Sequence, residues 1–424
     1  MALLLGAIAD DVTGATDLAA CLTRHGMRVV QTLGVPRTPV VPDADAIVVA
    51  LKTRTVPAAE AVSASLDAAS WLRAGGARQL FFKYCSTFDS TDAGNIGPVA
   101  EALLDQLGAQ FTIACPAYPG NRRTVYLGHL FVGSALLSES GMRDHPLTPM
   151  RDANLVRVLQ RQCRGSVGLV PFADVEAGPE TLRTAFERLR SAGTRIAIVD
   201  ALTDSHLTTI GQACGRLPLV TGGSGVAAGL PENFRAAGLL PVRQGWAPLP
   251  ATPGPVLVLA GSCSEATRAQ VEAMASRYPA IRVDPVGLAR TSDALDAAAA
   301  SLSDALTRGP AALVYSTAGP EDVQDAQAEL GAAEAAAVTE RALASLAVFA
   351  VRRGVRILIV AGGDTSGRVA AALGLTHLRI GPEIAPGVPW TIHEGDPALL
   401  VAFKSGNFGG PTFFTDAMET LPKP

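Results

Sequence analysis

The stretch LLLGAIADDVTGATDLAACLTRHGMRVVQTL, residues 3–33, decides the fold. Its first seven residues form an uninterrupted apolar run, which is typical of a strand buried on both faces. Residues 14–25 then predict a helix that ends at Gly26, and residues 28–33 predict a second strand. A strand, a helix and a strand in this order predict parallel strands with the helix packed on one face of the sheet.

The same alternation continues on both sides of a proline-rich segment, residues 239–255. Further strands are predicted at 46–51, 79–84, 111–117, 195–200 and 217–220, and then at 255–260, 311–315, 356–361 and 398–404. Helices are predicted at 57–74, 95–107, 265–277, 293–306, 324–353 and 366–373. We therefore predict two α/β domains, 1–238 and 256–424, each a mainly parallel sheet flanked by helices, joined by the linker 239–255.

Residues 121–150 interrupt the alternation with glycine, proline and aromatic residues. We interpret this segment as an elaborated loop or hairpin. It is the candidate for a lid over a binding site or for a homodimer contact.

The composition of the 424 residues excludes several classes of protein. With 48% hydrophobic and 17% charged residues the chain is globular, and its net charge of −4 gives no electrostatic reason to expect a nucleic-acid partner. The six cysteines are scattered without a CxxC pair, which indicates reduced thiols. The apolar start is short and no apolar run approaches a membrane span, so we expect a cytoplasmic protein.

Ligands of open parallel sheets bind at the carboxyl ends of the strands, so the loops there carry the chemistry. The first such loop holds the adjacent carboxylates Asp10 and Asp11, followed by Thr13. Two like charges leaving a buried strand repel each other, which should raise the pKa of one of them. One of the pair is therefore a candidate catalytic base, and the alternative is that Asp11 only caps the following helix.

The next two loops carry cations and hydroxyl groups. Arg54 and Lys83 follow neighbouring predicted strands, and the chain contains only four lysines. A guanidinium and an ammonium group placed in this way would hold a small carboxylate. Three residues of the loop after Lys83 complete the candidate site, namely Ser86 and Thr87 as substrate contacts and Asp89 as a rival base.

The second domain has three loops of small residues, each directly after a predicted strand. Small residues at a helix N-terminus expose backbone N–H groups to an anion such as phosphate. The candidate nucleotide-binding residues in these loops are Ser262, Ser264, Gly362, Gly363, Asp364, Thr365, Ser366, Gly367, Ser405 and Gly406. No lysine follows a glycine, so a Walker A motif is excluded, and no GxGxxG follows the first strand of either domain.

These motifs resemble those of the four-carbon acid sugar kinase family along essentially the whole chain. The resemblance rests on GAIADDVTGATDLA, KYCSTFDSTDAGNIGPV, ACPAYPGNRRTVYLGHLFVG and LLSESGMRDHPLTPM, and later on LAGSCS, AGGDTSG, GPEIAPGVPW and KSGNFGG. The third of these is the motif typical of the 3-oxo-tetronate branch. Two positions depart from the family pattern, with Val12 where Phe is common and Asp364 where Glu is common.

The resemblance implies a sugar-acid-binding first domain and a nucleotide-binding second domain that face each other across a cleft. It implies transfer of the ATP γ-phosphate to the O4 hydroxyl of a 3-oxo-tetronate, with Mg²⁺ bound to the nucleotide. Carried over by motif, the nucleotide contacts fall on Ser262, on residues 362–365 and on Gly406. Phosphoryl transfer depends mostly on positioning and charge stabilisation, so no dedicated metal motif is expected.

Two alternatives stay open. In the first, the chain is a kinase of this same family whose substrate is D-threonate or D-erythronate, which differ from 3-oxo-tetronates only at C2 or C3. In the second, which is a different class of protein, the chain is a non-catalytic binding protein with two lobes that bind a sugar acid. The phosphate-type loops disfavour this alternative. A dehydrogenase is disfavoured by the missing dinucleotide fingerprint.

Overall fold

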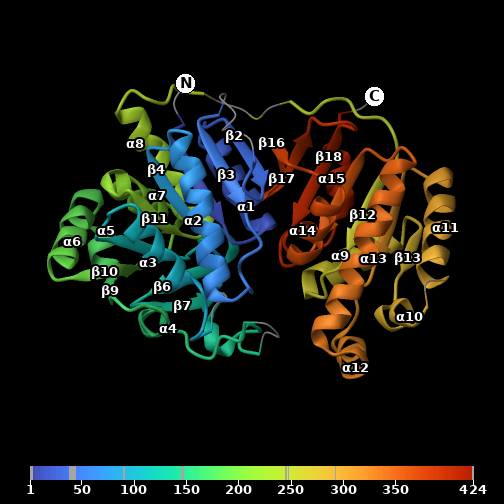
Figure 1. Ribbon diagram of the computed structural model, residues 1–424, viewed down its shortest axis with the longest axis horizontal. Helices are drawn as coiled ribbons and strands as arrows, with labels where there is room; N and C mark the ends of the chain where they lie inside the picture. The colour runs from blue at the N-terminus through green and yellow to red at the C-terminus, as the bar shows by residue number, and fades with distance from the viewer. Residues whose placement is uncertain are drawn as a thin grey trace. The chain divides into compact units, whose positions relative to one another are not determined.

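The chain forms two compact units, residues 1–245 and 246–424 (Figure 1). This computed structural model describes residues 3–37, 44–88, 91–144, 148–243, 246, 248–291 and 293–422. In each unit helices flank the strands of one sheet, so the predicted α/β class with mainly parallel sheets is confirmed. The division between the units falls inside the segment predicted as a linker. Among the helices of the described ranges, none has the length and hydrophobicity needed to cross a membrane.

The strands of unit 1 lie in the order β2-β3-β1-β4-β11-β5-β10-β9, and every neighbouring pair is parallel. The strands are β1 (Leu5–Ala9), β2 (Val29–Leu33), β3 (Ala46–Ala50), β4 (Gln79–Lys83), β5 (Thr112–Cys115), β9 (Ser166–Val170), β10 (Thr194–Val199) and β11 (Leu219–Gly222). The helices are α1 (Val12–Arg24), α2 (Ala58–Ala74), α3 (Ile96–Gln106), α4 (Leu155–Gln162), α5 (Phe172–Glu176), α6 (Pro179–Ser191), α7 (Asp204–Ala213) and α8 (Leu230–Ala236).

Strand β1 shows why the first apolar run becomes a central strand. All five of its residues are buried, as expected where helices cover both faces of a sheet. A Cβ atom on Gly6 would lie 3.0 Å from side-chain atoms of Leu72 on α2 and Leu80 on β4. The glycine therefore allows α2 to pack directly against the sheet.

Within the segment 121–150, residues 123–136 form a small antiparallel sheet of β6 (Arg123–Tyr126), β7 (His129–Val132) and β8 (Ala135–Leu136). Asp200, which is fully buried after β10, anchors its first turn by accepting hydrogen bonds from the amides of Leu127 (2.7 Å) and Gly128 (2.9 Å). Burial raises the pKa of Asp200 in spite of these hydrogen bonds. The predicted hairpin is thus present, and its role as a lid or dimer contact stays a prediction.

The strands of unit 2 lie in the order β13-β14-β12-β15-β18-β17-β16, in which β16-β17 and β17-β18 are antiparallel and the other pairs parallel. The strands are β12 (Val256–Ala260), β13 (Ala280–Arg282), β14 (Ala311–Tyr315), β15 (Ile357–Ala361), β16 (His377–Ala385), β17 (Val388–His393) and β18 (Leu399–Lys404). The helices are α9 (Glu265–Ala275), α10 (Pro285–Arg290), α11 (Asp293–Arg308), α12 (Pro320–Leu330), α13 (Ala332–Arg352), α14 (Gly363–Ala372) and α15 (Phe413–Glu419).

The single long helix predicted at 324–353 is wrong. It is two helices, α12 and α13, separated by Gly331. Gly331 has a φ of +81°, a backbone conformation that lacks a steric penalty only for glycine. The alanine-rich pattern runs unbroken across this position, so periodicity alone does not reveal the change of direction.

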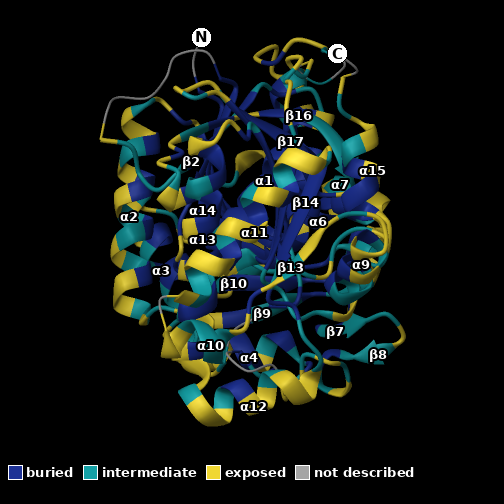
Figure 2. Cartoon of the chain, turned by 90° about the vertical axis from the view of Figure 1, so that its right-hand side faces the viewer, coloured by how far each residue is buried: buried dark blue, intermediate teal, exposed yellow. Residues whose placement is uncertain are grey.

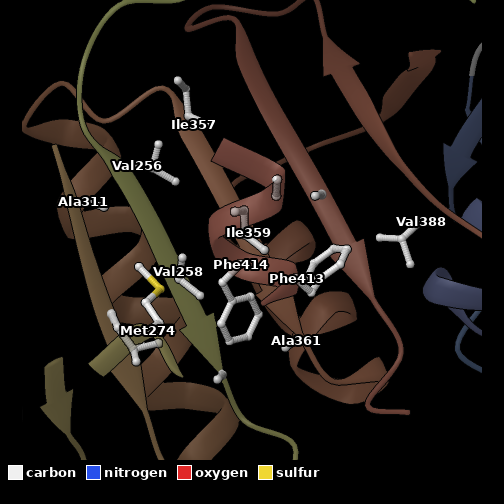
Figure 3. Close-up of a cluster of buried hydrophobic side chains, with 14 of the residues drawn as sticks. Val256, Val258, Met274, Ala311, Ile357, Ile359, Ala361, Val388, Phe413 and Phe414 are labelled. Atoms are coloured by element: carbon white, nitrogen blue, oxygen red, sulfur yellow. The ribbon is translucent and has the colours of Figure 1, made fainter. Parts of the chain in front are cut away.

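The core of unit 2 lies between the sheet and helices that include α9 and α15 (Figure 3). Figure 3 shows Val258 of β12 and Ile359 of β15 near the rings of α15, with Val256 and Ile357 further along the same two strands. Those rings belong to Phe413 and Phe414, each 1% exposed. In Figure 2 the strands are mostly buried, whereas helices such as α2 and α12 expose one side. This is the layered burial that the alternating pattern predicts.

Candidate functional site

In unit 1 the first three candidate loops meet at one edge of the sheet. Ala9 at the end of β1 pairs with Ala50 of β3 on one side and with Lys83 of β4 on the other. Because these strands are parallel, the loops after them leave the sheet side by side. The structure therefore brings Asp10, Arg54 and Lys83 together. The strands before Arg54 and Lys83 are not direct neighbours, because β1 lies between β3 and β4.

Arg54 binds both adjacent carboxylates. Its Nε donates to Asp10 Oδ2 at 2.9 Å and its Nη2 donates to Asp10 Oδ1 at 2.7 Å, which is a bidentate contact. Nη2 also donates to Asp11 Oδ1 at 2.7 Å. The loop that carries Arg54 is held by Asn95, a buried residue whose Nδ2 donates to the carbonyl oxygens of Thr53 (2.5 Å) and Arg54 (3.3 Å). Asn95 is a positioning residue that sequence reasoning missed.

The two adjacent carboxylates have opposite pKa shifts. Burial raises the pKa of Asp10 above its usual value, although Arg54 opposes the shift. Burial acts on Asp11 too, but Arg54, Lys83, the Thr13 hydroxyl and the Gly14 amide outweigh it and lower the pKa. Thr13 Oγ1 donates to Asp11 Oδ2 at 2.6 Å. One of the pair is thus raised, as predicted, but burial contributes more to this than mutual repulsion does.

Asp11 is also the N-cap of α1. Its Oδ1 accepts a hydrogen bond from the Gly14 amide at 3.0 Å, and its backbone is extended as an N-cap requires. Asp11 therefore caps α1 and also contacts Arg54, and the alternative that capping is its only role stays a prediction. Asp10 has no such capping bond among those described for α1, which distinguishes the two carboxylates.

Lys83 lies close to the carboxylates of Asp10 and Asp11. Its side chain is only 3% exposed and its Nζ donates to the Tyr84 carbonyl oxygen at 2.8 Å. A Cβ atom on Gly14 would lie 3.0 Å from Nζ, so the start of α1 approaches the ammonium group closely. The carboxylate clamp of Arg54 and Lys83 stays a prediction. The structure adds that Arg54 already pairs with two protein carboxylates, so it is not a free cation.

The hydroxyl residues of the third loop lie next to the cluster in sequence. Thr87 is 5% exposed and its Oγ1 lies 3.0 Å from Cys85 Sγ, and Ser86 is half-buried. Asp89, the rival base, lies outside the described residues.

A third buried carboxylate at this edge was missed from the sequence. Asp17 on α1 is 5% exposed and accepts hydrogen bonds from Ser224 Oγ (2.5 Å) and Tyr118 Oη (3.5 Å). Ser224 follows β11 and Tyr118 follows β5, so Asp17 ties two further strand-end loops to α1. Asp17 stands in the motif GAIADDVTGATDLA, and this position was the signal by which the sequence could have indicated it as a site residue.

In unit 2 the three small-residue loops also meet at one edge. Ala361 at the end of β15 pairs with Ala260 of β12 and with Lys404 of β18, so the loops after these strands are neighbours. The Gly362 amide donates to the Lys404 carbonyl oxygen at 2.8 Å, and Ser264 Oγ donates to the Gly406 carbonyl oxygen at 2.6 Å. A side chain at Gly406 would collide with Ser262 Oγ.

Two helices begin at this edge with their N–H groups directed away from the helix body. Gly362, the residue before α14, has a φ of +124°, which favours glycine. Gly363 and Asp364 form the first turn of α14, with Thr365 behind them. Such N-termini attract anions.

Not every predicted nucleotide residue has a side chain available for a ligand. Ser264 caps α9 by accepting from the Thr267 amide at 3.2 Å. Ser366 is fully buried, with its Oγ donating to the Val360 carbonyl oxygen at 3.4 Å, which favours a packing role. Gly367 lies inside α14. Any contact of these residues to a nucleotide would come from their backbone.

Lys404 organises the third loop from inside. It is fully buried, and its Nζ donates to the carbonyl oxygens of Ser405 (2.9 Å), Gly406 (2.9 Å) and Phe408 (3.0 Å) and to Thr267 Oγ1 (3.2 Å). Burial lowers the pKa of Lys404 to about 7, whereas its carbonyl acceptors favour the charged form. Because the chain contains only four lysines, the sequence drew attention to Lys404, but it predicted no role for this residue.

The described residues contain no group of three or more His, Cys, Asp or Glu side chains that would hold a metal ion alone. Asp364 is the acidic residue of the first turn of α14.

Comparison with known proteins agrees with this division of chemistry. Residues 5–230 match the family model of a sugar-binding N-terminal domain, and residues 257–414 match that of a nucleotide-binding C-terminal domain. The chain is 57% identical to a 3-oxo-tetronate kinase of Cupriavidus necator and 56% identical to one of Burkholderia multivorans, over 99% of this chain and 97% of each relative.

Two solved structures share the fold of this chain. The crystal structure of a Salmonella typhimurium LT2 protein, 42% identical, matches with a TM-score of 0.87 over 99% of this chain and 100% of that one. That of a Haemophilus influenzae protein, also 42% identical, matches with a TM-score of 0.77 over 98% of this chain and 100% of that one. The chain therefore belongs to the four-carbon acid sugar kinase family.

Proposed function

We propose that this protein transfers the γ-phosphate of ATP to the O4 hydroxyl of a 3-oxo-tetronate. The observation that carries the proposal is the pairing, in one chain, of a buried carboxylate–guanidinium cluster in unit 1 with three phosphate-type loops in unit 2. Relatives named 3-oxo-tetronate kinase, 43% to 57% identical over nearly the whole chain, support this substrate over other sugar acids.

In unit 1, Asp10 orients the O4 hydroxyl and accepts its proton as the phosphoryl group is transferred. Its raised pKa suits a base that takes up a proton late in a loose transition state. Arg54 holds both oxygens of Asp10 and neutralises Asp11, while Lys83 adds positive charge near the substrate carboxylate. Ser86 and Thr87 supply hydroxyl groups to the same substrate.

In unit 2, the loops at residues 261–264, 362–367 and 404–406 hold the phosphates of ATP through backbone N–H groups. Asp364 would hold a magnesium ion bound with ATP, and this ion would neutralise charge on the transferred phosphate. Lys404 acts indirectly, because its hydrogen bonds keep the third loop in shape.

The experiment is an ADP-release assay with the purified full chain over 3-oxo-tetronates, D-threonate and D-erythronate. We expect the largest kcat/KM with a 3-oxo-tetronate and formation of its 4-phosphate. A larger value with D-threonate or D-erythronate would replace the substrate assignment within the same family. Binding of a sugar acid without any ADP release would instead favour the non-catalytic two-lobed binding protein.

We also propose a homodimer through the sheet of β6, β7 and β8. Tyr126 and Leu127 in its first turn are 42% and 52% exposed, which is unusual for large apolar side chains next to each other. Light scattering should show a dimer that Leu127→Asp converts to a monomer. The matched control is Val242→Asp, at a residue that is 81% exposed outside this sheet. A monomer in the unaltered protein would contradict the proposal.

A further inference from the structure

Unit 1 contains a cavity of about 470 Å³ at the amino edge of its sheet, where β4 and β11 begin. Gln79, the first residue of β4, and Pro218, the residue before β11, both line it. Lys83 and the candidate site lie at the opposite end of β4, so this cavity is separate from the candidate site of unit 1. Its volume is within the range of about 300–1,000 Å³ for small-molecule sites.

Three arginines give this cavity its charge. Arg73, Arg78 and Arg216 line it, and none of the described residues in the lining is an aspartate or a glutamate. Within the described ranges, none of the three guanidinium groups forms an ion pair, and their one side-chain hydrogen bond runs from Arg73 Nη1 to the Ala77 carbonyl oxygen at 3.0 Å. Many arginines elsewhere in unit 1 do pair with carboxylates. The positive charge of the cavity is thus not balanced by neighbouring acidic side chains.

A buried side chain fixes the backbone that carries two of these arginines. Gln79 is 6% exposed, and its Nε2 donates to the carbonyl oxygens of Cys214 (2.9 Å) and Leu217 (2.7 Å), which flank Arg216 in sequence. Arg78 stands directly before Gln79. The segments that carry Arg78 and Arg216 are therefore held in a fixed relation to each other.

The rest of the lining is largely apolar. Leu107 after α3, Phe234 of α8 and Leu239 contribute side chains to it. The cavity therefore offers guanidinium donors and apolar contacts without an acidic acceptor, which repels cations and attracts anions. A guanidinium group can bind two oxygens of a phosphate at once, so a phosphate group matches this lining in charge and geometry.

The helix ends at this edge explain only part of the charge. Basic side chains are favourable near helix C-termini, and Arg73 lies in the last turn of α2. Arg78 lies between α2 and β4 and belongs to no helix. Compensation of helix dipoles therefore accounts for Arg73 but leaves Arg78 without a role.

We propose that this cavity binds a small organic anion through a phosphate group, at a site separate from those of ATP and the sugar acid. Three guanidinium groups together balance a phosphate dianion and one carboxylate, and the apolar side chains contact the carbon atoms between them. This inference does not depend on the proposed kinase function, because it uses only residues at the amino edge of the sheet.

The test uses the full-length protein and two probes, inorganic phosphate and phosphoglycolate, which carries a phosphate and a carboxylate. Calorimetry gives the dissociation constants for the unaltered protein, Arg78→Gln and Arg216→Gln. The matched control is Arg352→Gln, because Arg352 is an exposed arginine in the last turn of α13 that does not line the cavity. Melting temperatures of all variants show whether the fold is kept.

We expect the unaltered protein to bind phosphoglycolate, and each cavity variant to weaken this binding on the order of tenfold or more. Arg352→Gln should leave the dissociation constant unchanged. Inorganic phosphate that binds with the same sensitivity to both cavity substitutions would support the site and show that the phosphate group alone suffices.

Two results would overturn the proposal. The first is that neither probe binds the unaltered protein. The second is that Arg78→Gln and Arg216→Gln keep the dissociation constants of the unaltered protein, because the probes would then bind elsewhere. A lower melting temperature together with such unchanged binding would assign the arginines to stabilisation of this sheet edge.

Discussion

The two strand-end sites use opposite means to handle charge. In unit 1 the site is built from side chains, and two carboxylates are balanced by Arg54 with Lys83 nearby. In unit 2 the candidate phosphate loops consist of small residues, and a buried ammonium group, Lys404, contacts carbonyl oxygens rather than a carboxylate. The carboxyl edge of the strands thus suits a reacting hydroxyl group in unit 1 and an anion in unit 2. Side-chain substitutions should therefore affect chemistry in unit 1 and nucleotide binding in unit 2.

The largest effect is expected for Asp10→Asn. A base should lose about 10²–10⁴-fold in kcat while ATP and the sugar acid still bind. Steady-state kinetics together with calorimetry for both substrates measure this. Asp11→Asn is the matched control, because Asp11 caps α1 and should lose melting temperature more than turnover. If both variants keep near-normal kcat, the pair is structural and Asp89 becomes the candidate base.

Arg54→Ala should have the next largest effect. It removes the partner of two buried carboxylates, so we expect kcat/KM for the sugar acid to fall about 100-fold, with the KM for ATP little changed. Arg54 lowers the pKa of Asp11, and the resulting stability is present above the unfolded pKa of 3.8. The variant should therefore unfold at lower urea concentration at pH 7. A KM effect confined to ATP would instead assign Arg54 to the phosphates.

Gly363→Val tests whether the loop after β15 in unit 2 binds phosphate through its backbone amides. A branched side chain in the first turn of α14 obstructs the approach of phosphate to the backbone amides. We expect the dissociation constant for ATP to rise on the order of tenfold, while the sugar acid binds the full-length variant normally. Ala372→Val is a control at an exposed position on the same helix, further from its N-terminus. Unchanged ATP affinity in Gly363→Val would refute the assignment of this loop.

The smallest effect is a pH dependence from Lys404. Burial lowers the pKa of the Lys404 ammonium group to about 7 in the folded chain, whereas the ordinary lysine pKa is 10.5. Unfolding therefore takes up a proton between these values, so the free energy of unfolding rises with pH there, by at most about 1.4 kcal/mol per pH unit. Lys404→Met should lose this slope in urea titrations at several pH values. An identical slope in the variant would show that the ammonium keeps its proton.

Much of unit 1 could be predicted from local pattern. Continuous apolar runs such as residues 3–9 are the signature of parallel strands, and β1 with its neighbours β3 and β4 lies where expected. The antiparallel hairpin of β16 and β17 was missed, and so was the break at Gly331. Periodicity reports the burial of a segment, but it does not report its partner or a single backbone turn.

The sequence by itself determined which loops carry carboxylates, cations and small residues, because those follow directly from residue type and position after a strand. Tertiary structure decided what these groups do. Asp10 and Arg54 are 44 residues apart and meet only because β3 lies beside β1. The raised pKa of Asp10 and the lowered pKa of Lys404 come from burial, which depends on every element packed around them.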